Sequence, residues 1–562
     1  MKKFFEKHDL VKISLIMILV TVLLSWVIKQ GSFDAVGSFV LNEDYTRIGI
    51  FDFVSYGFSG LYYFTAFVSF FFVLGAFYQF LSKLGAYQKL TDKIAAKIKG
   101  KEILFSLIIS LVFAALASIL NDYLVLVAFM PFIITISSKL KMDKISSFVM
   151  TFGAMLIGIL GATVCQRVVG INAYQQYFNL EITSDLFEKI LLFAIAFIIY
   201  SLFNILYLKK TLEDNKEKKT IIGFFLILID LGLLIYFYII KKLIFYILLG
   251  VTVLAIILYV LYLFKLFDKL FNKIKGKKKN KKESKKKNNK KSKNAKKEKV
   301  EKVVKTIEVN VCEDLFAEKV KNSDKSNTIA LIIVGVLAII TTILAYIPWT
   351  TVFKVDWFTT AHKAVTEANL FGKPVFSYIL GNVAEFGSWD LLGIQVVMIL
   401  SMVVLAICYK KGLTDIIDSF CEGFKKSGKL VAILLISYLI IIFAVLYPVI
   451  PTILSKIVGT KFNVLTTGLA GLITSLFTSE YQYVVNLTST FVLKYTENLN
   501  VISIILQSIC GLVSFFTPSS AMLLVGLSYL EIPYKDWMKY IWKFLLAMLI
   551  VILVMAYIIV LI

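Results

Sequence analysis

The chain has 562 residues, 59% of them hydrophobic, and a mean hydropathy of +0.81. Soluble domains contain about 45–50% apolar residues, so this composition excludes an ordinary soluble protein. The formal net charge is +24, but the charged residues stand in short blocks between long apolar runs. The sequence therefore predicts an all-α, multi-pass membrane protein, with the runs in lipid and the blocks in water.

One tract carries much of the positive charge. Lys273–Lys299 contains sixteen Lys and two acidic residues, Glu283 and Glu298. A poly-Lys tract is typical of a solvated, largely disordered segment, here expected over 267–327. It would attract anionic lipid. Because it has no Arg and no interleaved aromatic residues, nucleic-acid binding is not expected.

Apolar runs of about 20 residues predict membrane-spanning helices. The runs lie at 10–28, 58–82, 188–208, 221–240, 243–265, 328–347, 390–409, 430–447 and 541–561. The first run has Lys2, Lys3 and Lys7 before it and Lys12 near its start, and could imitate a secretory signal. No small-residue cleavage site comes after it, so we interpret it as a retained helix.

Lysine placement orients the predicted spans, because positively charged loops stay in the cytoplasm. The expected location is the cytoplasmic membrane of a bacterium, and this rule places the N-terminus and the Lys-rich loop on its cytoplasmic side and the C-terminus outside. Segments 29–57, 171–187 and 350–388 have fewer Lys and are expected outside. The Lys-rich blocks expected inside are Lys83–Lys101, Lys139–Lys144, Lys209–Lys219 and Lys410–Lys429.

Two further apolar regions contain polar interruptions. Runs 103–120 and 123–138 are separated by Asn121-Asp122, and runs 462–477 and 481–495 by Thr478-Ser479-Glu480. Each pair must return to the side on which it started, so it forms either two helices or one re-entrant hairpin. Polar backbone at membrane depth is tolerated where protein or water covers it, which favours hairpin tips near the bilayer centre.

A broken helix is predicted after each pair. The first runs from Gly153 to Arg167 through Gly161-Ala162-Thr163. The second runs from Gly511 to Ser520, where Pro518 removes a helical hydrogen bond. A weaker similarity, Asp52 to Phe58 against Asp418 to Phe424, precedes the hairpins.

The shared order of these features predicts two inverted repeats, as in secondary transporters. The predicted domains are a first repeat at 1–220, two connecting helices at 221–266, the Lys-rich loop at 267–327 and a second repeat at 328–562.

Four stretches resemble one carrier family. They are Leu24–Phe33, Leu74–Ile94 with Lys99-Gly100-Lys101-Glu102, Thr517–Gly526 and Ile532–Trp537. They are similar to the YfcC-type carriers, which are grouped with the anaerobic C4-dicarboxylate carriers of the DcuC type in the ion transporter superfamily. The resemblance implies an elevator-type secondary carrier and a homodimer.

This chain departs from the family pattern at two places. Thr163 is followed by Val-Cys-Gln-Arg167 where the family commonly continues into Asn-Pro, and Thr478-Ser479-Glu480 replaces Ser-Gly-Ser-Gly. These changes leave the substrate open.

Candidate ligands for a solute or a coupling ion lie at the tips and the helix breaks. Helix N-termini there favour anionic groups, freed carbonyls can hold Na⁺, and hydroxyl groups suit both. The alternative is that Ser and Thr only bond helix backbones. The candidates are Asn121, Asp122, Gly161, Thr163, Arg167, Thr478, Ser479, Glu480, Thr517, Pro518, Ser519 and Ser520.

Three charged candidates allow opposite interpretations. A carboxylate inside a membrane costs about 2.5–3.5 kcal/mol on insertion scales, so Asp122 and Glu480 suggest H⁺ or Na⁺ coupling or a partner for a substrate ammonium. They could instead sit on a tip that reaches water. Arg167 could clamp a carboxylate, neutralise either acid, or mark the outer water boundary.

The predicted function is a symporter or antiporter of a small organic ion such as an amino acid, a peptide-like solute or a carboxylate. The alternative is a membrane-protein insertase or a lipid-handling protein that uses the Lys-rich loop. The sequence has no phosphate-binding GxxxxGK[ST], HExxH or GxSxG motif, so we expect neither ATP hydrolysis nor an intramembrane enzyme. No cofactor and no metal site beyond Na⁺ are expected.

Overall fold

The structure, a computed structural model, describes residues 9–33, 38–170, 177–212, 221–226, 311–318, 327–492 and 494–561. It divides into two compact units, Met1–Thr211 with Val311–Ile562, and Leu212–Asn310. Most of the predicted connecting helices and the whole Lys273–Lys299 tract lie outside the described residues.

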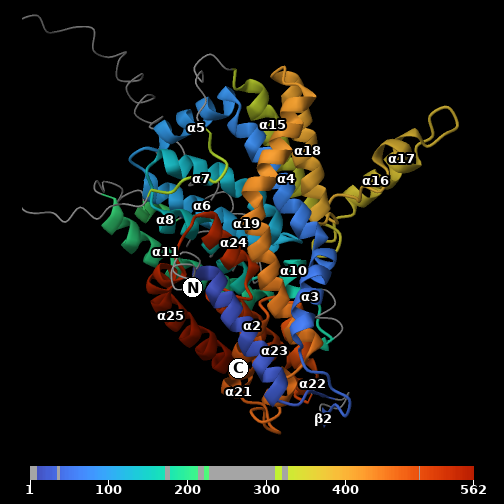
Figure 1. The fold of residues 1–562 in the computed structure, drawn as a ribbon, viewed down its shortest axis with the longest axis vertical. Coiled ribbons are helices and arrows are strands. Elements are labelled where there is room, and N and C mark those ends of the chain that lie inside the picture. The colour runs from blue at the N-terminus through green and yellow to red at the C-terminus, as the bar shows by residue number, and fades with distance from the viewer. Residues whose placement is uncertain are drawn as a thin grey trace, which may run out of the picture. The chain divides into compact units, whose positions relative to one another are not determined.

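The first part of the chain is helical apart from one short β-hairpin, in which β1 and β2 pair antiparallel (Figure 1). Its elements are α2 (Asp9–Val27), β1 (Gly31–Phe33), β2 (Phe39–Leu41), α3 (Ile50–Tyr63), α4 (Thr65–Ser82), α5 (Gly85–Ile98), α6 (Glu102–Ile119), η1 (Tyr123–Phe129), α7 (Met130–Lys139), α8 (Lys144–Phe148), η2 (Val149–Gly153), α9 (Ala154–Leu160), α10 (Gln166–Val169) and α11 (Leu186–Thr211).

The second part is likewise helical. Its elements are α15 (Ile329–Tyr346), α16 (Trp357–Glu367), α17 (Val375–Leu380), α18 (Leu391–Cys408), α19 (Leu413–Leu446), α20 (Ile450–Leu454), α21 (Val464–Phe477), α22 (Tyr481–Val492), η4 (Thr496–Asn498), α23 (Leu499–Val513), α24 (Ala521–Tyr529) and α25 (Tyr534–Leu561).

Eight helices of the described residues are long and apolar enough to cross a membrane, which confirms a multi-pass helical membrane protein. Seven of them lie at predicted spans, and the eighth is α6, the first arm of the first predicted hairpin. The helix breaks also lie where the sequence placed them, after Leu160 and after Val513.

One predicted span is interrupted in the structure, so the prediction of a continuous helix was wrong. Residues 58–82 were expected to form a single helix, but α3 ends at Tyr63 and α4 begins at Thr65. The Thr65 hydroxyl lies 2.7 Å from the Leu61 carbonyl oxygen and 2.8 Å from that of Tyr62. Such bonding competes with the helical ladder and favours a bend at this position.

A second prediction was wrong in its boundary. The span expected at 430–447 belongs to α19, which starts at Leu413 and includes most of the Lys-rich block expected as a loop. Asp415 accepts a 2.9 Å hydrogen bond from the Gly412 N–H, which starts the helix early. Buried Ser419, Gly423 and Ser427 then recur every four residues on one face, so the residues expected as a loop form a helix that packs through this face.

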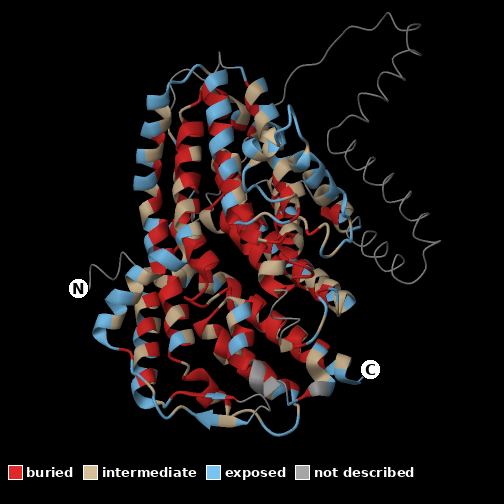
Figure 2. Cartoon of the chain, turned by 90° about the vertical axis from the view of Figure 1, so that its right-hand side faces the viewer, coloured by how far each residue is buried: buried red, intermediate tan, exposed pale blue. Residues whose placement is uncertain are grey.

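Packing arranges the long helices in two groups, which contact each other chiefly through α19 and α24. The first, called the paired-helix group, comprises α2, α3, α4, α15, α18 and α19, in which α4 lies along α19. The second, called the hairpin group, comprises α6 to α11 and α21 to α25, in which α6 packs on α9 and α21 on α23. Figure 2 shows that the buried residues gather where these helices face one another.

Ion pairs connect the Lys-rich turns. Lys139 Nζ lies 2.6 Å from Asp92 Oδ1, and Lys83 Nζ lies 2.7 Å from Glu422 Oε2. The blocks 83–101, 139–144 and 410–429 therefore meet at one end of the molecule. Their proximity agrees with the expectation that they share one side of the membrane, although the pairs do not say which side.

We expect a methyl group to be tolerated at one α19 glycine and not at another. A Cβ on Gly423 would overlap the backbone of Gly75 and Ala76 in α4, whereas one on Gly428 would meet open space. Gly423→Ala should lower the free energy of unfolding by about 1–3 kcal/mol. Gly428→Ala should be neutral or stabilising by up to about 1 kcal/mol. Thermal unfolding in detergent measures both; equal effects would contradict this account of the helix contact.

Candidate functional site

The first tip is held by its own backbone and by the second half of the chain. Asp122 caps η1, because its Oδ1 accepts a 2.9 Å hydrogen bond from the Leu124 N–H. The Asn121 N–H donates to the Tyr346 carbonyl at 2.7 Å, and the Asn121 side chain donates to the Gly387 carbonyl at 2.5 Å. Asn121 therefore anchors the tip through its N–H groups, while its Oδ1 is buried and has no partner among the described residues.

The first helix break is fastened to α6. The Ser118 carbonyl accepts hydrogen bonds of 3.1–3.2 Å from the N–H groups of Thr163, Val164 and Cys165. The Thr163 hydroxyl lies 3.1 Å from the same carbonyl, and the Ser118 hydroxyl donates to Gly161 at 3.0 Å. Backbone groups freed by the break are thus satisfied inside the protein, as lipid requires.

The second tip and the second break repeat this arrangement. The Thr517 hydroxyl donates to the Leu476 carbonyl at 2.6 Å, and the Ser519 hydroxyl lies 3.2 Å from it. The Ser479 hydroxyl donates to the Ser519 carbonyl at 2.9 Å. Thr517 closes a turn across Pro518, because its carbonyl accepts from the Ser520 N–H at 3.1 Å.

Arg167 joins the two tips. Its Nη1 lies 3.3 Å from Asp122 Oδ2, and its Nη2 lies 3.5 Å from Glu480 Oε1. The side chains of Asp122, Glu480 and Arg167 are 14%, 15% and 20% exposed. Of the alternatives left open by the sequence, the structure thus has Arg167 neutralising both acids at once.

The surroundings of Arg167 are aromatic. Its guanidinium carbon lies 4.8 Å from the ring centre of Phe67 and 5.7 Å from that of Tyr123. Arg167 Nε is buried, and no described residue offers it a partner. Two carboxylates around one guanidinium have a formal net charge of −1, so the cluster as a whole favours an additional cation.

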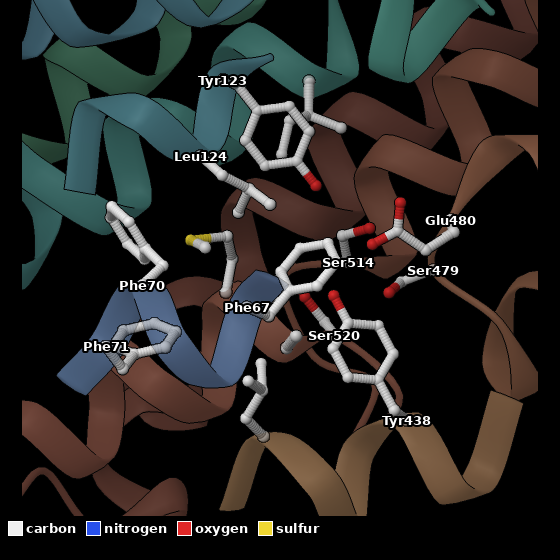
Figure 3. A pocket seen from close by; sticks show the side chains of 14 residues that line it. Phe67, Phe70, Phe71, Tyr123, Leu124, Tyr438, Ser479, Glu480, Ser514 and Ser520 are labelled. Carbon is white, nitrogen blue, oxygen red and sulfur yellow. The ribbon is translucent and has the colours of Figure 1, made fainter. Parts of the chain in front are cut away.

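A small cavity lies beside the ion pair (Figure 3). The Glu480 carboxylate, the hydroxyl groups of Ser514 and Ser520, and those of Tyr123 and Tyr438 point toward one space. Neither tyrosine hydroxyl has a hydrogen-bond partner within the described part of the chain. The space measures about 10 Å³, room for a single water molecule, so the site is closed to an organic solute in this structure.

The predicted site residues separate into two sets. Asp122, Arg167, Ser479, Glu480 and Ser520 surround the ion pair and the cavity. Most of the others hold the breaks and tips: the hydroxyl groups of Thr163, Thr517 and Ser519 bond backbone carbonyls, Gly161 packs against Phe193, and Asn121 and Pro518 shape their turns. The hydroxyl group of Thr478 is buried and has no partner among the described residues.

Sequence reasoning missed the aromatic residues and Ser118. Phe67, Tyr123 and Tyr438 all line the cavity, and Tyr438 stacks on Phe64 with ring centres 3.8 Å apart. Tyr123 directly follows Asp122, and Tyr438 is a polar residue inside the apolar run 430–447. Those two positions were the available signals. Phe67 gave none, because an aromatic residue in an apolar helix is ordinary.

No protein-family model, no curated protein and no solved structure matches this chain. Within the described residues, no group of three or more His, Cys, Asp or Glu side chains is placed to hold a metal ion. The site is therefore interpreted from its own geometry.

Removing the shared cation should destabilise the protein. Arg167→Gln leaves two mostly buried carboxylates close together without compensation, and we expect a loss of about 3 kcal/mol. The double variant Arg167→Gln/Glu480→Gln also lacks one of the repelling charges, and should regain part of the lost stability. Thermal unfolding in detergent gives the comparison.

Arg47→Gln is the matched control, because Arg47 is the other arginine of the chain and is exposed. We expect it to change stability by less than about 0.5 kcal/mol. If Arg167→Gln were as mild as Arg47→Gln, the proposed bridge between the tips would be wrong.

Proposed function

We propose that this protein is a secondary active transporter, a symporter or antiporter that moves a small organic ion across a bacterial cytoplasmic membrane. The observation that carries the proposal is the closed, water-sized cavity at the point where two hairpin tips and two helix breaks meet around one arginine and two acids. Discontinuous helices that meet at a charged site are characteristic of such carriers.

Equivalent local contacts support two inverted repeats. The Asp52 side chain accepts from the Gly49 N–H at 2.7 Å at the start of α3, as Asp415 does from Gly412 at the start of α19. These caps align Asp52 with Asp415 rather than with Asp418, which corrects the similarity noted in the sequence. In the same alignment α2 corresponds to α18, and α4 corresponds to the later part of α19. The contact between α4 and α18 is then equivalent to that between α19 and α2, and the contact between α6 and α9 is equivalent to that between α21 and α23.

The formal charge of the site favours a solute with an ammonium group. Arg167 is already shared by Asp122 and Glu480, so it has little charge left to attract a carboxylate. The tyrosine hydroxyl groups and ring faces beside Glu480 suit an ammonium group. We therefore favour an amino acid or another zwitterion or cation over a dicarboxylate. H⁺ or Na⁺ coupling would use the same acids.

The remaining assignments rest on the sequence. Membership of the YfcC-type and DcuC-like carriers, a homodimer, a cytoplasmic N-terminus, an external C-terminus and lipid attraction at Lys273–Lys299 are parts of this proposal. It includes no catalytic residue and no cofactor.

A lipid-handling protein is the second candidate, and one feature favours it. An apolar groove of about 370 Å³ runs between α4, α5 and α7 on one side and α15 and α18 on the other, lined by residues such as Phe77, Phe132, Leu331 and Met398. Acyl chains would fill such a groove in a bilayer. The charged closed site has no part in that function, so the transporter ranks first.

Uptake into proteoliposomes tests the proposal. Labelled basic and neutral amino acids, short peptides and dicarboxylates would be offered under imposed H⁺ or Na⁺ gradients and with preloaded counter-solute. We expect saturable uptake of an ammonium-bearing solute. Glu480→Gln should reduce it at least tenfold, and Asp122→Asn should weaken its dependence on the driving gradient.

Glu497→Gln is the control, because Glu497 is an exposed acid near the end of the same hairpin. Its uptake should equal that of the unmodified protein. Uptake that is saturable for dicarboxylates alone would overturn the preference for an ammonium group. No uptake of any solute, together with lipid exchange between vesicles, would favour the second candidate.

A further inference from the structure

A short segment outside the long helices, Val311–Glu318, is packed into the end of the molecule where the Lys-rich turns meet. Val311 forms an antiparallel bridge with Asp143, and the Cys312 N–H donates to the Met142 carbonyl at 2.9 Å. Cys312 is fully buried. This beginning of the segment is therefore fixed to the turn between α7 and α8, which belong to the hairpin group.

The middle of the segment lies between the two helix groups. Asp314, 7% exposed, accepts hydrogen bonds from the hydroxyl of Tyr529 in α24 and, at 3.1 Å, from that of Thr135 in α7. Phe316 is fully buried, with ring centres 5.9 Å from Tyr529 and 6.3 Å from Tyr78 in α4. One aromatic ring thus touches α24 of the hairpin group and α4 of the paired-helix group.

The end of the segment is bound to the other side. Glu318 accepts a hydrogen bond from the Gln79 side chain in α4 and lies 3.8 Å from Lys426 Nζ in α19. Its carbonyl accepts from the Gln88 side chain in α5 at 3.2 Å. Eight residues therefore join the turn after α7 to α4 and α19.

The closed cavity lies at the same boundary between the groups. Phe70 and Phe71 of α4 and Tyr438 of α19 line one side of it, and Ser479, Glu480 and other residues of the hairpin group line the other. Phe70 and Tyr78 are eight residues apart on α4, and Leu434 and Lys426 are eight apart on α19. At 1.5 Å per residue, the segment crosses the boundary about 12 Å from the cavity along both helices.

We propose that Val311–Glu318 is a latch that holds the paired-helix group and the hairpin group together and blocks access to the site from the Lys-rich end. This inference rests on the proposed transport function, because an organic solute can enter only if the groups that line the cavity separate. If the two groups separate at the Lys-rich end, the segment can stay bound to only one of them. Either the contacts of Phe316 and Glu318 or those of Cys312 and Asp314 must then break. The latch must therefore release before the site opens.

The strength with which the latch docks depends on pH. Burial raises the pKa of Asp314 to about 6, while hydrogen bonds from Tyr529 and Thr135 and the charge of Lys426 limit the rise. Tyr78 and Tyr87 also face this carboxyl group. Because the docked pKa is above the ordinary value of 3.8, docking is strongest at acid pH and weakens as pH rises through about 6. At neutral pH the docked segment thus carries a buried, ionised carboxylate.

The reactivity of two native cysteines measures the exposure of the latch and of the site separately. Cys312 lies within the latch, and Cys510, also buried, lines the space beside Glu480 with its Sγ 3.3 Å from the Ser479 carbonyl. The full-length protein would be treated with N-ethylmaleimide, and the alkylation rate of each cysteine followed by mass spectrometry. Exposed Cys421 serves as the internal standard.

Phe316→Ala removes the ring between Tyr78 and Tyr529, and we expect it to accelerate alkylation of both Cys312 and Cys510 at least tenfold. Tyr529→Phe removes only the hydroxyl bonded to Asp314, and should accelerate both to a smaller extent. The control, Phe371→Ala, truncates a fully exposed ring and should change neither rate. A single cooperative thermal transition, with its midpoint well above the temperature of the assay, shows that a variant is folded.

Faster alkylation of Cys312 with an unchanged rate at Cys510 in folded variants would overturn the latch, because its release would then leave the site closed. Unchanged alkylation of Cys312 in both variants would overturn it as well, since the segment would not be held by these contacts. Either result can coexist with saturable uptake into proteoliposomes, so failure of the latch is distinguishable from failure of the transporter proposal.

Discussion

The structure depends on one guanidinium group. Asp122 and Glu480 come from opposite halves of the chain, and two carboxylates in an environment of low dielectric repel each other unless a cation lies between them. Arg167 supplies that cation from the first helix break. Its position brings both polar interruptions and the first break to one point, and the remaining formal net charge of −1 is the basis for the proposed preference for an ammonium-bearing solute.

The helix breaks impose a second constraint. A broken helix frees N–H and C=O groups, and lipid offers them no partners, so the protein must satisfy them. Carbonyls of Ser118 and Leu476 and the hydroxyl groups of Thr163 and Thr517 do this. Hydroxyl-rich sequence at a break is thus mostly structural in this closed form. The acids, together with the Tyr123 and Tyr438 hydroxyl groups that have no hydrogen-bond partner among the described residues, are the groups that the proposed function assigns to a ligand.

Closure of the site and packing of the Val311–Glu318 latch involve the same boundary. The cavity has room for one water molecule because α4 and α19 lie against the tips and the second break, and the latch joins the same two sides about 12 Å away. A tightly packed interior does not deform gradually, so in the proposed transport cycle the site would open by separation of the two groups as bodies. The proposed latch, which holds both groups, would then control access without touching the solute.

The sequence by itself determined the membrane-spanning helices, the two polar interruptions and the breaks near Gly161 and Pro518, because transfer of residues into lipid and loss of helical hydrogen bonds are local effects that add along the chain. It also identified Asp122, Arg167 and Glu480, since charges are costly in lipid. Only the tertiary structure decided that one arginine serves both acids, that Tyr123 and Tyr438 complete the cavity, and that α19 begins at Leu413. Those outcomes depend on which distant surfaces meet, and pairings between distant residues leave no periodic signal in the sequence.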